Sequence, residues 1–361
     1  MKEINDKKSA LIAMSGGVDS SVAAYLMKEK GYRCMGTTMR LFEKGDSETG
    51  TCGSNKDIED AAAVAEKIGI PYEALDFEMN FKEEIIEKFI RIYEAGGVPN
   101  PCVDCNRTMK FGKLLEFAEE KGLYHLVTGH YARVFYDEKK GRYMLRKAAD
   151  LSKDQSYVLY TLSQEQLSHI EFPLGEMTKD ETRKIAEKCG FSNAHRKDSQ
   201  DICFVPDGDY VGFMERYRGK PYEDGDIVDE SGKVLGTHHG AVRYTRGQRK
   251  GLGIAAEKPL YVLGKDMESN KVFVGDEAGL FSDTLYAEDV NWISVETPKE
   301  PLRVKAKTRY RQKEQWATVY PDGSDKIKLV FDEPQRAITI GQAVVFYDED
   351  LVVGGGTISG I

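Results

Sequence analysis

The chain has 361 residues, 40% of which are hydrophobic, and a net charge of −9 at pH 7. It is too long for one ordinary domain, so we expect two or three domains with packed cores. No apolar run is long enough to span a bilayer, and the N-terminal apolar stretch is too short for a signal peptide. We therefore expect a cytoplasmic protein whose six cysteines serve metal binding or catalysis rather than a disulfide framework.

Short apolar runs alternate with helical patterns over the first two hundred residues. The runs, which predict strands, cover residues 10–14, 34–41, 71–77 and 125–129. Apolar residues at helical spacing lie between them, at 58–68, 86–93 and 111–118. Thr178 and Glu181 form a capping box that predicts a helix ending at Gly190. Alternating strands and helices predict an α/β fold with a doubly wound parallel sheet over residues 1–204.

The first apolar run leads into the loop SGGVDSS at 15–21 and then into an alanine-rich helical segment. Glycines after a strand let backbone N–H groups close around an anion, and the following helix start adds its dipole. The loop is neither a Walker loop nor a dinucleotide fingerprint, because it lacks Gly-Lys-Ser/Thr and G-x-G-x-x-G. Without a lysine, the hydroxyls of Ser15, Ser20 and Ser21 would donate to phosphate, and Asp19 would help to hold Mg²⁺. The alternative is a Ser/Asp helix cap after a tight turn, but the complete strand–loop–helix pattern favours phosphate binding.

Two cysteines three positions apart follow an Asn-Pro pair in GVPNPCVDCN at 97–106. This spacing suits a metal clip, a redox disulfide or a reactive nucleophile with a helper. The neighbouring residues do not decide between these three alternatives.

After about residue 204 the segments become short, and turns rich in glycine and aspartate recur. Runs typical of β-strands dominate, among them KVFVG, QWATVY, KIKLVF and AVVFYDED. We expect an all-β half made of two small modules that meet near residue 280, at 205–280 and 281–361.

Two basic clusters stand out in this acidic chain. The stretch RVKAKTRYRQK has a cation at every second position, namely Arg303, Lys305, Lys307, Arg309, Arg311 and Lys313. In a strand, this period places all six on one face, which self-repulsion disfavours unless an anion binds there. The stretch RYTRGQRKG carries Arg243, Arg246, Arg249 and Lys250. Either cluster alone is compatible with a solvated surface, but the two together favour a polyanionic partner.

The stretch SGGVDSS resembles the PP-loop of the ATP pyrophosphatases, which cleave ATP between the α- and β-phosphates. Such enzymes adenylate a carbonyl-like oxygen and then displace AMP with a nucleophile. The resemblance implies an ATP site formed by Ala13, Met14, Ser15, Gly16, Gly17, Val18, Asp19, Ser20, Ser21, Met39 and Gly129. Gly129 would let the backbone approach the nucleotide, and Met39 would line the adenine pocket. For Met39 the alternative is plain core, which the sequence alone favours.

Five further motifs follow in order, namely VPNPCVDCN, TGHYAR at 128–133, LSKDQSYVLY at 151–160, KDSQDICFV at 197–205 and TRGQRKGLGI at 245–254. Together they resemble the tRNA-specific 2-thiouridylases, which replace oxygen with sulfur on carbon 2 of the wobble uridine. The resemblance covers essentially the whole chain. It implies a PP-loop domain followed by two β-rich RNA-contacting domains, the last a β-barrel. The tRNA contacts that it implies are Asn100, Pro101, Lys153, Asp154, Gln155, Arg309, Tyr310 and Arg311.

The same resemblance implies roles for three cysteines. Cys203 would carry a persulfide received from a sulfur-relay or cysteine-desulfurase donor, and Cys105 would release the sulfur, for example by forming a disulfide with Cys203. Many relatives carry an acid/base aspartate at the position of Cys102, a role that a thiol with its higher reference pKa cannot simply inherit. Cys102 is therefore either a helper thiol or, with Cys105 and Cys203, a ligand of a 4Fe-4S cluster with one open iron.

Three other functions remain as alternatives. Another PP-loop ligase, such as an amide-forming synthetase, would need neither the paired cysteines nor the cationic strand. A non-catalytic RNA-binding protein would tolerate loss of SGGVDSS and of the cysteines. The same chemistry could also act at another RNA position, because Gly97 and Val98 replace a more polar pair that is often found there.

Overall fold

The computed structural model describes residues 6–42, 53–196 and 202–361. The chain divides into two compact units. The first comprises Met1–Ile86, Pro101–Pro206 and Glu349–Gly354, and the second comprises Glu87–Asn100, Asp207–Asp348 and Gly355–Ile361. The two divisions after Asn100 and Pro206 fall beside the two cysteine motifs in the sequence.

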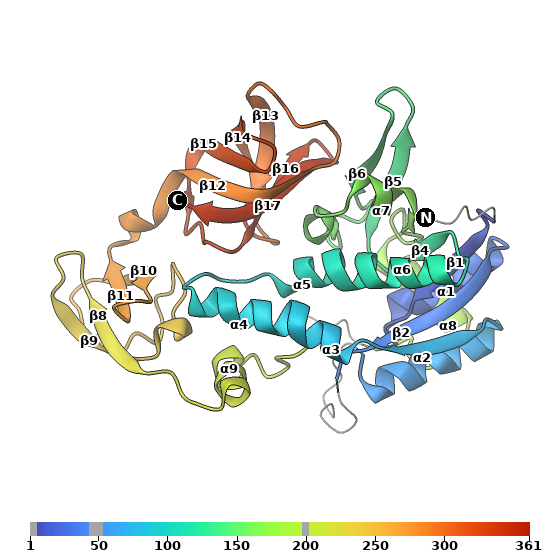
Figure 1. Ribbon diagram of the computed structural model, residues 1–361, viewed down its shortest axis with the longest axis horizontal. Helices are drawn as coiled ribbons and strands as arrows, with labels where there is room; N and C mark the ends of the chain where they lie inside the picture. Colours follow the sequence, from blue (N-terminus) through green and yellow to red (C-terminus); the bar gives the residue numbers. More distant parts are fainter. Residues whose placement is uncertain (1–5, 43–52, 197–201) are drawn as a thin grey trace. The chain divides into compact units, whose positions relative to one another are not determined.

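A parallel five-stranded sheet lies at the centre of the first unit (Figure 1). Its strands, in spatial order, are β3 (Tyr72–Asp76), β2 (Arg33–Arg40), β1 (Ser9–Ala13), β4 (His125–Val127) and β7 (Ile170–Glu171). β1 pairs in parallel with β2 on one side and with β4 on the other. The direction of winding therefore reverses at β1, as in a doubly wound sheet, and this confirms the predicted α/β fold.

The helices of this unit follow the predicted apolar spacing. The main ones are α1 (Val18–Glu29), α2 (Asn55–Ile68), α6 (Leu114–Glu120) and α8 (Lys179–Lys188). The shorter ones are α3 (Glu78–Phe81), η1 (Lys82–Ile86), α5 (Pro101–Asp104), η2 (Cys105–Lys113), η3 (Ser156–Leu159) and α7 (Gln164–Ser168). The capping box of Thr178 and Glu181 is confirmed at the start of α8. A hairpin of β5 (Ala132–Asp137) and β6 (Arg142–Lys147), which the apolar runs did not predict, follows the central strand β4.

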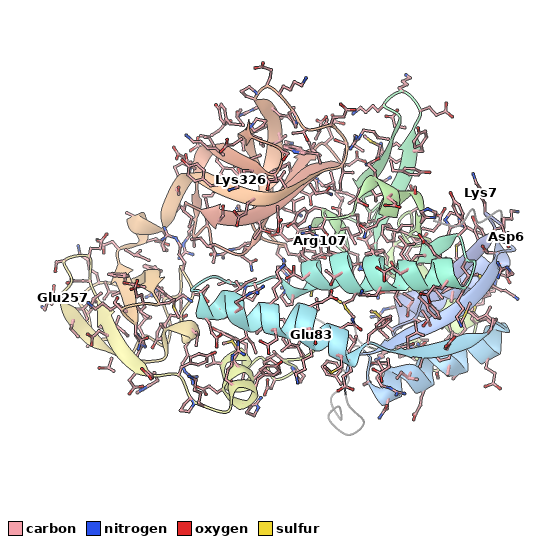
Figure 2. The ribbon with its side chains drawn as sticks, in the orientation of Figure 1. Asp6, Lys7, Glu83, Arg107, Glu257 and Lys326 are labelled. Carbon is pink, nitrogen blue, oxygen red and sulfur yellow. The ribbon has the colours of Figure 1, made fainter. Side chains whose placement is uncertain are left out.

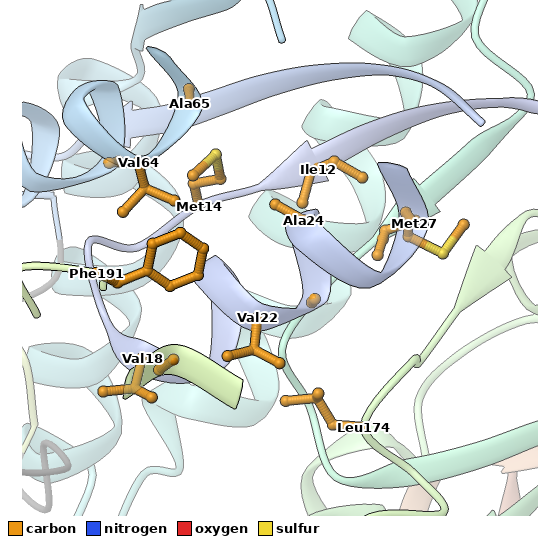
Figure 3. Close-up of a cluster of buried hydrophobic side chains, with 14 of the residues drawn as sticks. Ile12, Met14, Val18, Val22, Ala24, Met27, Val64, Ala65, Leu174 and Phe191 are labelled. Atoms are coloured by element: carbon orange, nitrogen blue, oxygen red, sulfur yellow. The ribbon is translucent and has the colours of Figure 1, made fainter. Parts of the chain in front are cut away.

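A buried cluster holds the start of α1 against the sheet (Figure 3). It contains Val18 and Val22 of α1, Met14 at the end of β1, and Val64 of α2, all almost fully buried. Phe191 packs into the same cluster from beyond α8. Residues on both sides of the loop 15–21 are therefore fixed in the core.

The second unit contains a helix where the sequence predicted only β-structure. Helix α9 (Tyr210–Arg218) starts at Asp209, whose carboxylate accepts from the Gly212 N–H at 2.9 Å. It lies against α4 (Glu87–Glu94), which belongs to the same unit. Arg218 joins the two helices through ion pairs with Glu87 at 3.1 Å and Glu94 at 3.0 Å. The prediction of an all-β second half is therefore wrong at this segment.

Two β-structures make up the rest of the second unit. The first is a four-stranded sheet in the order β10 (Tyr261–Asp266), β11 (Lys271–Gly275), β8 (Asp224–Val228) and β9 (Val234–His239). The second contains β12 (Phe281–Trp292), β15 (Lys326–Arg336), β14 (Gln315–Asp322), β13 (Leu302–Lys307), β16 (Ala343–Asp348) and β17 (Leu351–Gly360) in that order. Pairing of β12 with β17 closes these six strands, which confirms the expected β-barrel. Within the described ranges, no helix is long and apolar enough to cross a membrane.

Candidate active site

The loop 15–21 lies at the C-terminal end of the central strand β1, next to the point where the winding reverses. Ser15 is exposed, Gly17 and Asp19 are half-buried, and the intervening residues are buried. No side chain caps α1 at Gly17, whereas Ser54 and Thr178 cap α2 and α8. An uncapped helix start after a glycine turn, at this edge of a doubly wound sheet, can bind an anion through its backbone N–H groups.

Two glycines allow close backbone contacts around this loop. Gly16 has a φ of 69°, and a Cβ atom there would lie 2.7 Å from the Cα atom of Asp57. Gly129 follows β4, and a Cβ atom there would lie 2.7 Å from the backbone nitrogen of Ser20. The backbone at Gly129 therefore packs directly on the loop, as the resemblance implied.

The serine hydroxyls of the loop bond mainly within it. Ser20 Oγ and Ser21 Oγ both donate to the carbonyl of Gly17, at 3.1 and 2.9 Å. The Ser15 N–H donates to Ser20 Oγ at 3.1 Å. Ser21 is fully buried, so its hydroxyl points into the protein and not towards a ligand as predicted. Ser15 carries the loop hydroxyl that reaches the surface.

Asp19, the carboxylate of the loop, contacts a lysine that the sequence analysis did not single out. Lys179 Nζ lies 2.8 Å from both carboxylate oxygens of Asp19. The Tyr131 hydroxyl donates to Asp19 Oδ1 at 2.9 Å and lies 3.0 Å from Thr182 Oγ1. Tyr131 belongs to the motif TGHYAR, so two of the recognised motifs meet at Asp19.

Asn193 and Arg196 hold the other side of the loop. Asn193 Nδ2 donates to the Gly16 carbonyl at 2.8 Å and to Ser21 Oγ at 2.9 Å. Arg196 donates to the same carbonyl at 3.3 Å and forms an ion pair with buried Asp57 at 2.6 Å. These contacts join residues more than 130 positions apart, and no local pattern in the sequence marks them.

His130, beside Gly129, is buried between the rings of Phe111 and Phe172. Its Nδ1 lies 2.7 Å from the hydroxyl of Thr128. Burial lowers the pKa of His130 well below its ordinary value, so the imidazole is neutral. This ring therefore supports the strand end from behind and carries no charge to the loop.

The remaining predicted nucleotide residues lie at the ends of β1 and β2. Ala13 ends β1, and Met39 lies half-buried near the end of β2. Met14 is almost fully buried, its N–H donates to the Thr37 carbonyl at 2.7 Å, and its carbonyl accepts from Thr38 Oγ1 at 2.6 Å. Met14 is thus a core residue in this structure.

Cys102 and Cys105 lie on one continuous helical segment that changes its winding at Cys105. Pro101 begins α5, where proline is favoured because the first N–H groups of a helix need no intrahelical acceptor. From Cys105 the segment is a π-helix, a form often found at functional sites. Cys102 is exposed and Cys105 half-buried, while the adjacent Asn106 is buried and donates to the Val158 carbonyl at 2.9 Å.

Cys203 approaches the same region from the end of the first unit. The ring of its neighbour Phe204 lies 5.8 Å from that of Phe81 in α3, and α3 also contacts η2. Figure 2 labels Glu83 of η1 and Arg107 of η2, and both elements contact α5. Residues 197–201 of the motif KDSQDICFV lie outside the described ranges. The two cysteine motifs thus converge on α3.

No metal centre is formed by these thiols as they are arranged here. Considering residues 6–42, 53–196 and 202–361, no three or more His, Cys, Asp or Glu side chains are grouped so that they could hold a metal ion. Cys102, Cys105 and Cys203 therefore do not fit a cluster site in this arrangement.

The motif LSKDQSYVLY, predicted to contact tRNA, makes several bonds within the protein. Asp154 accepts from the Ala148 N–H at 3.0 Å and from the Ser156 hydroxyl at 2.8 Å. Gln155 Oε1 accepts from the Tyr131 N–H at 2.9 Å. Asp154 and Gln155 therefore shape the loop, and Lys153 is half-buried next to them.

The cationic stretch 303–313 is not one strand, so the prediction of six cations on one face is wrong. β13 ends at Lys307, which is buried with its Nζ 5.2 Å from the centre of the Tyr347 ring. A turn follows, held by Gln312, whose side-chain oxygen accepts from the Thr308 N–H at 2.8 Å. This turn presents Arg309, Tyr310 and Arg311, all exposed, at the end of the barrel strand.

The second basic cluster is largely used inside the protein. Arg243 forms an ion pair with Glu215 at 2.8 Å, and Arg246 donates to the carbonyls of Leu263 and Gly279. Arg249 and Lys250 are exposed. Two of its four cations thus have structural roles, which weakens the case for a broad anionic surface there.

The segment before the cysteines is fixed on the second unit. Gln342 Nε2 donates to the carbonyls of Val98 and Pro99, each at 3.0 Å. The Val98 N–H donates to the Ile340 carbonyl at 2.9 Å. These bonds set the position of the chain up to Asn100.

Known proteins resemble the chain along its whole length. Residues 8–207 match the tRNA methyl transferase HUP domain, 212–276 the tRNA methyl transferase PRC-barrel domain, and 282–358 the aminomethyltransferase beta-barrel domain. The tRNA-specific 2-thiouridylase MnmA of Acetivibrio thermocellus is 48% identical over 356 residues, which are 98% of this chain and 99% of that protein. The enzyme of the same name from Clostridioides difficile is 49% identical over 353 residues, which are 97% and 98% of the two chains. A solved complex of a 4-thiouridine synthetase with RNA and bound ATP is 16% identical, with a TM-score of 0.37 over 58% of this chain and 50% of that chain. With this identity to curated relatives over nearly its full length, the chain belongs to the family of the tRNA-specific 2-thiouridylases MnmA.

Proposed function

We propose that the protein uses ATP to replace the oxygen on carbon 2 of the wobble uridine of tRNA with sulfur. The observation that carries this proposal is the loop 15–21, an uncapped helix start at the switch point of a doubly wound sheet. Its PP-loop sequence implies cleavage of ATP to AMP and pyrophosphate. Membership of the 2-thiouridylase family supplies the class of acceptor.

The chemistry requires that the uridine oxygen first become a leaving group. The carbon-2 oxygen attacks the α-phosphorus of ATP, pyrophosphate leaves, and an adenylated uridine results. The outer sulfur of a Cys203 persulfide then attacks carbon 2, and AMP leaves with the oxygen. The Cys105 thiolate attacks the Cys203 sulfur, so that a Cys105–Cys203 disulfide forms and the transferred sulfur stays on the base. A cellular dithiol reduces this disulfide before the next cycle.

The arrangement around the cysteines supports a thiolate mechanism. In the π-helical segment, Lys110 lies about one turn along from Cys105, because hydrogen bonds in this helix join residues five apart. A nearby cation favours the thiolate, which is the reactive form of cysteine. We assign Cys102 as a helper thiol and derive no step through a 4Fe-4S cluster, since the three thiols are not grouped as metal ligands.

The ATP site that we propose is built from the accessible part of the loop. Ser15 and the backbone N–H groups at the start of α1 bind phosphate, while Gly16, Val18, Ser20 and Ser21 fix the loop. Ala13, Met39 and Gly129 line the nucleotide at the strand ends. Asp19 faces the bound Mg²⁺, which neutralises phosphate charge when present.

The tRNA contacts and the sulfur donor complete the proposal. The exposed turn of Arg309, Tyr310 and Arg311 binds the RNA backbone, and Asn100, Pro101 and Lys153 lie next to the target base. The sulfur comes from a sulfur-relay or cysteine-desulfurase protein of the cytoplasm. Residues 1–204 form the catalytic domain, and 205–280 and 281–361 form the two RNA-contacting domains.

Incubation with α-labelled ATP, tRNA and a persulfide donor tests this function. We expect AMP, pyrophosphate and one 2-thiouridine per tRNA, all abolished when the wobble uridine of the tRNA is replaced by cytidine. ADP and phosphate as products would contradict the PP-loop assignment. Thiolation that persists on the cytidine-34 tRNA would favour another RNA position, and AMP formation without thiolation would favour another ligase.

A further inference from the structure

Lys179 brings an ammonium group to a phosphate loop that has no lysine of its own. Its Nζ lies 2.8 Å from Oδ1 and 2.8 Å from Oδ2 of Asp19, so it spans the carboxylate. The two residues are 160 positions apart in the sequence. An ammonium and a carboxylate in this bidentate contact neutralise each other.

The local structure holds Lys179 in place. It is the first residue of α8, directly after the capping box of Thr178 and Glu181. Its backbone N–H donates to Asp150 Oδ2 at 3.3 Å, and its Nζ lies 5.9 Å from the centre of the Tyr131 ring. The Tyr131 hydroxyl binds the same carboxylate at Oδ1. The carboxylate is therefore fixed by two groups from different elements.

Burial separates the roles of the two charged groups. The side chain of Lys179 is 9% exposed, whereas that of Asp19 is 30% exposed. The carboxylate is thus the more accessible member of the pair, and the ammonium lies deeper in the protein. A ligand arriving from solvent meets Asp19 before Lys179.

Electrostatics gives this order a function. The triphosphate of ATP is strongly negative, and an unneutralised carboxylate in the loop would repel it at short range in a partly buried site. A loop without lysine depends on backbone N–H groups and the helix dipole for attraction, and these carry only partial charges. Neutralisation of Asp19 from behind removes the repulsion.

We propose that Lys179 is a positioning residue of the ATP site, which neutralises and orients Asp19 so that the loop accepts the triphosphate with its Mg²⁺. This inference rests on the proposed use of ATP at the loop. Lys179 acts through Asp19, because the carboxylate lies between the ammonium and the accessible side of the loop.

The test measures the binding of ATP, ADP and AMP at fixed Mg²⁺ to the full chain and to four variants. Lys179→Met removes the ammonium at similar length, and Asp19→Asn removes the carboxylate charge at equal size. The double variant removes both charges. Lys184→Met, an exposed lysine of the same helix, is the matched control.

We expect Lys179→Met to weaken ATP binding on the order of a hundredfold, as expected for loss of one partner of a close charge pair. The loss should shrink from ATP through ADP to AMP, because the repulsion from Asp19 scales with the charge of the nucleotide. Lys184→Met should bind all three nucleotides like the wild type. The double variant should bind ATP as well as Asp19→Asn does, since no charge is left for the lysine to neutralise.

Three results would overturn the inference. Equal losses for ATP and AMP would mean that Lys179 has only a structural role. An additional loss in the double variant relative to Asp19→Asn would mean that Lys179 binds phosphate directly. Unchanged ATP binding by Lys179→Met would remove any role. If Lys179→Met does not fold, the comparison of the double variant with Asp19→Asn still decides, because neither holds an unpaired buried charge.

Failure of the proposed function has a different signature. In that case the wild type itself would not bind ATP or would release ADP rather than AMP. Any difference between the variants in a protein that binds ATP concerns Lys179 alone.

Discussion

A Cβ atom built on Gly129 lies 2.7 Å from the backbone nitrogen of Ser20, and 2.8 Å from the carbonyl carbon of Asp19. Such distances are shorter than real Cβ contacts, so any side chain at Gly129 must displace the phosphate loop from the end of β4. This contact explains a glycine at the end of the central strand without appeal to the conformation of its own backbone.

Gly129→Ala is therefore expected to weaken ATP binding by more than tenfold, because the loop must shift by several tenths of an ångström. Isothermal titration with Mg²⁺ and ATP measures this. The control is Gly264→Ala, where an added Cβ atom meets nothing within 4 Å and the stability should change by less than about 0.5 kcal/mol. Wild-type affinity in Gly129→Ala would show that the loop and β4 move independently.

Cys105→Ser and Cys203→Ser should each abolish thiolation while ATP binding stays unchanged. A serine hydroxyl does not carry a persulfide and is a poor nucleophile towards sulfur. Cys189→Ser, at the end of α8, is the control and should thiolate normally. Mass spectrometry of the tRNA nucleosides gives the product. Residual 2-thiouridine above background in Cys203→Ser would mean that the persulfide forms elsewhere.

Cys102→Asp distinguishes a helper thiol from a cluster ligand. The substitution introduces the carboxylate that many relatives carry at this position, so a helper role predicts that much of the activity with a persulfide donor is retained. Iron and acid-labile sulfide are measured on the same anaerobic preparation. Activity that rises and falls with the iron content, in the wild type and in the variant, would instead establish a required cluster.

Arg311→Gln should weaken tRNA binding and reduce its dependence on salt. One lost phosphate contact lowers the slope of log K against log salt by about 0.7 to 0.9. Arg303→Gln is the matched control, since Arg303 is already engaged by Asp332 on the neighbouring part of the barrel. Filter binding from low to high salt gives both slopes. An unchanged slope for Arg311→Gln would assign the turn 308–313 to ordinary surface.

The stability of the protein should fall in mild acid partly because of His130. Its folded pKa lies well below the ordinary value of 6.5, so below pH 6.5 the unfolded state binds a proton that the folded state does not. Unfolding is therefore favoured as the pH falls, by up to about 1.4 kcal/mol per pH unit for this one group.

His130→Asn keeps a hydrogen-bonding group next to Thr128 and removes the titration. Between pH 6.5 and about 5, its free energy of unfolding should decline less steeply than that of the wild type by that amount. His195→Asn, an exposed histidine, should leave the slope unchanged. Urea unfolding at several pH values measures all three proteins, and equal slopes for His130→Asn and the wild type would mean that His130 is protonated in the fold.

Local patterns in the sequence predicted those parts of the fold that depend on neighbours in the chain. The strand–loop–helix around 15–21 and the capping box at Thr178 are of this kind, because apolar spacing and capping act within a few residues. Helix α9 was missed since its segment lies among glycine-rich turns, and its partner α4 comes from more than 110 residues earlier. The strand at 303–313 was predicted too long because the alternation of cations continues through a turn.

The candidate site divides in the same way. The loop and the cysteines carry their chemistry in short motifs, so the sequence marked them directly. Lys179, Asn193 and Arg196 were missed because their partners Asp19 and Gly16 lie 160 to 180 positions away. Only the folded chain shows that these residues meet. Ser21 was predicted to face phosphate because a hydroxyl in a loop does not reveal which way it points.

The distance along the chain between the loop and its supports has a consequence for biosynthesis. The phosphate loop leaves the ribosome among the first segments, whereas Lys179, Asn193 and Arg196 follow about 160 to 180 residues later. During that interval a nascent chain displays the full PP-loop sequence but lacks the groups that bind Asp19 and the Gly16 carbonyl. A nascent polypeptide that stalls before residue 196 therefore carries the motif without a finished pocket, and ATP capture marks completion of the first unit during translation.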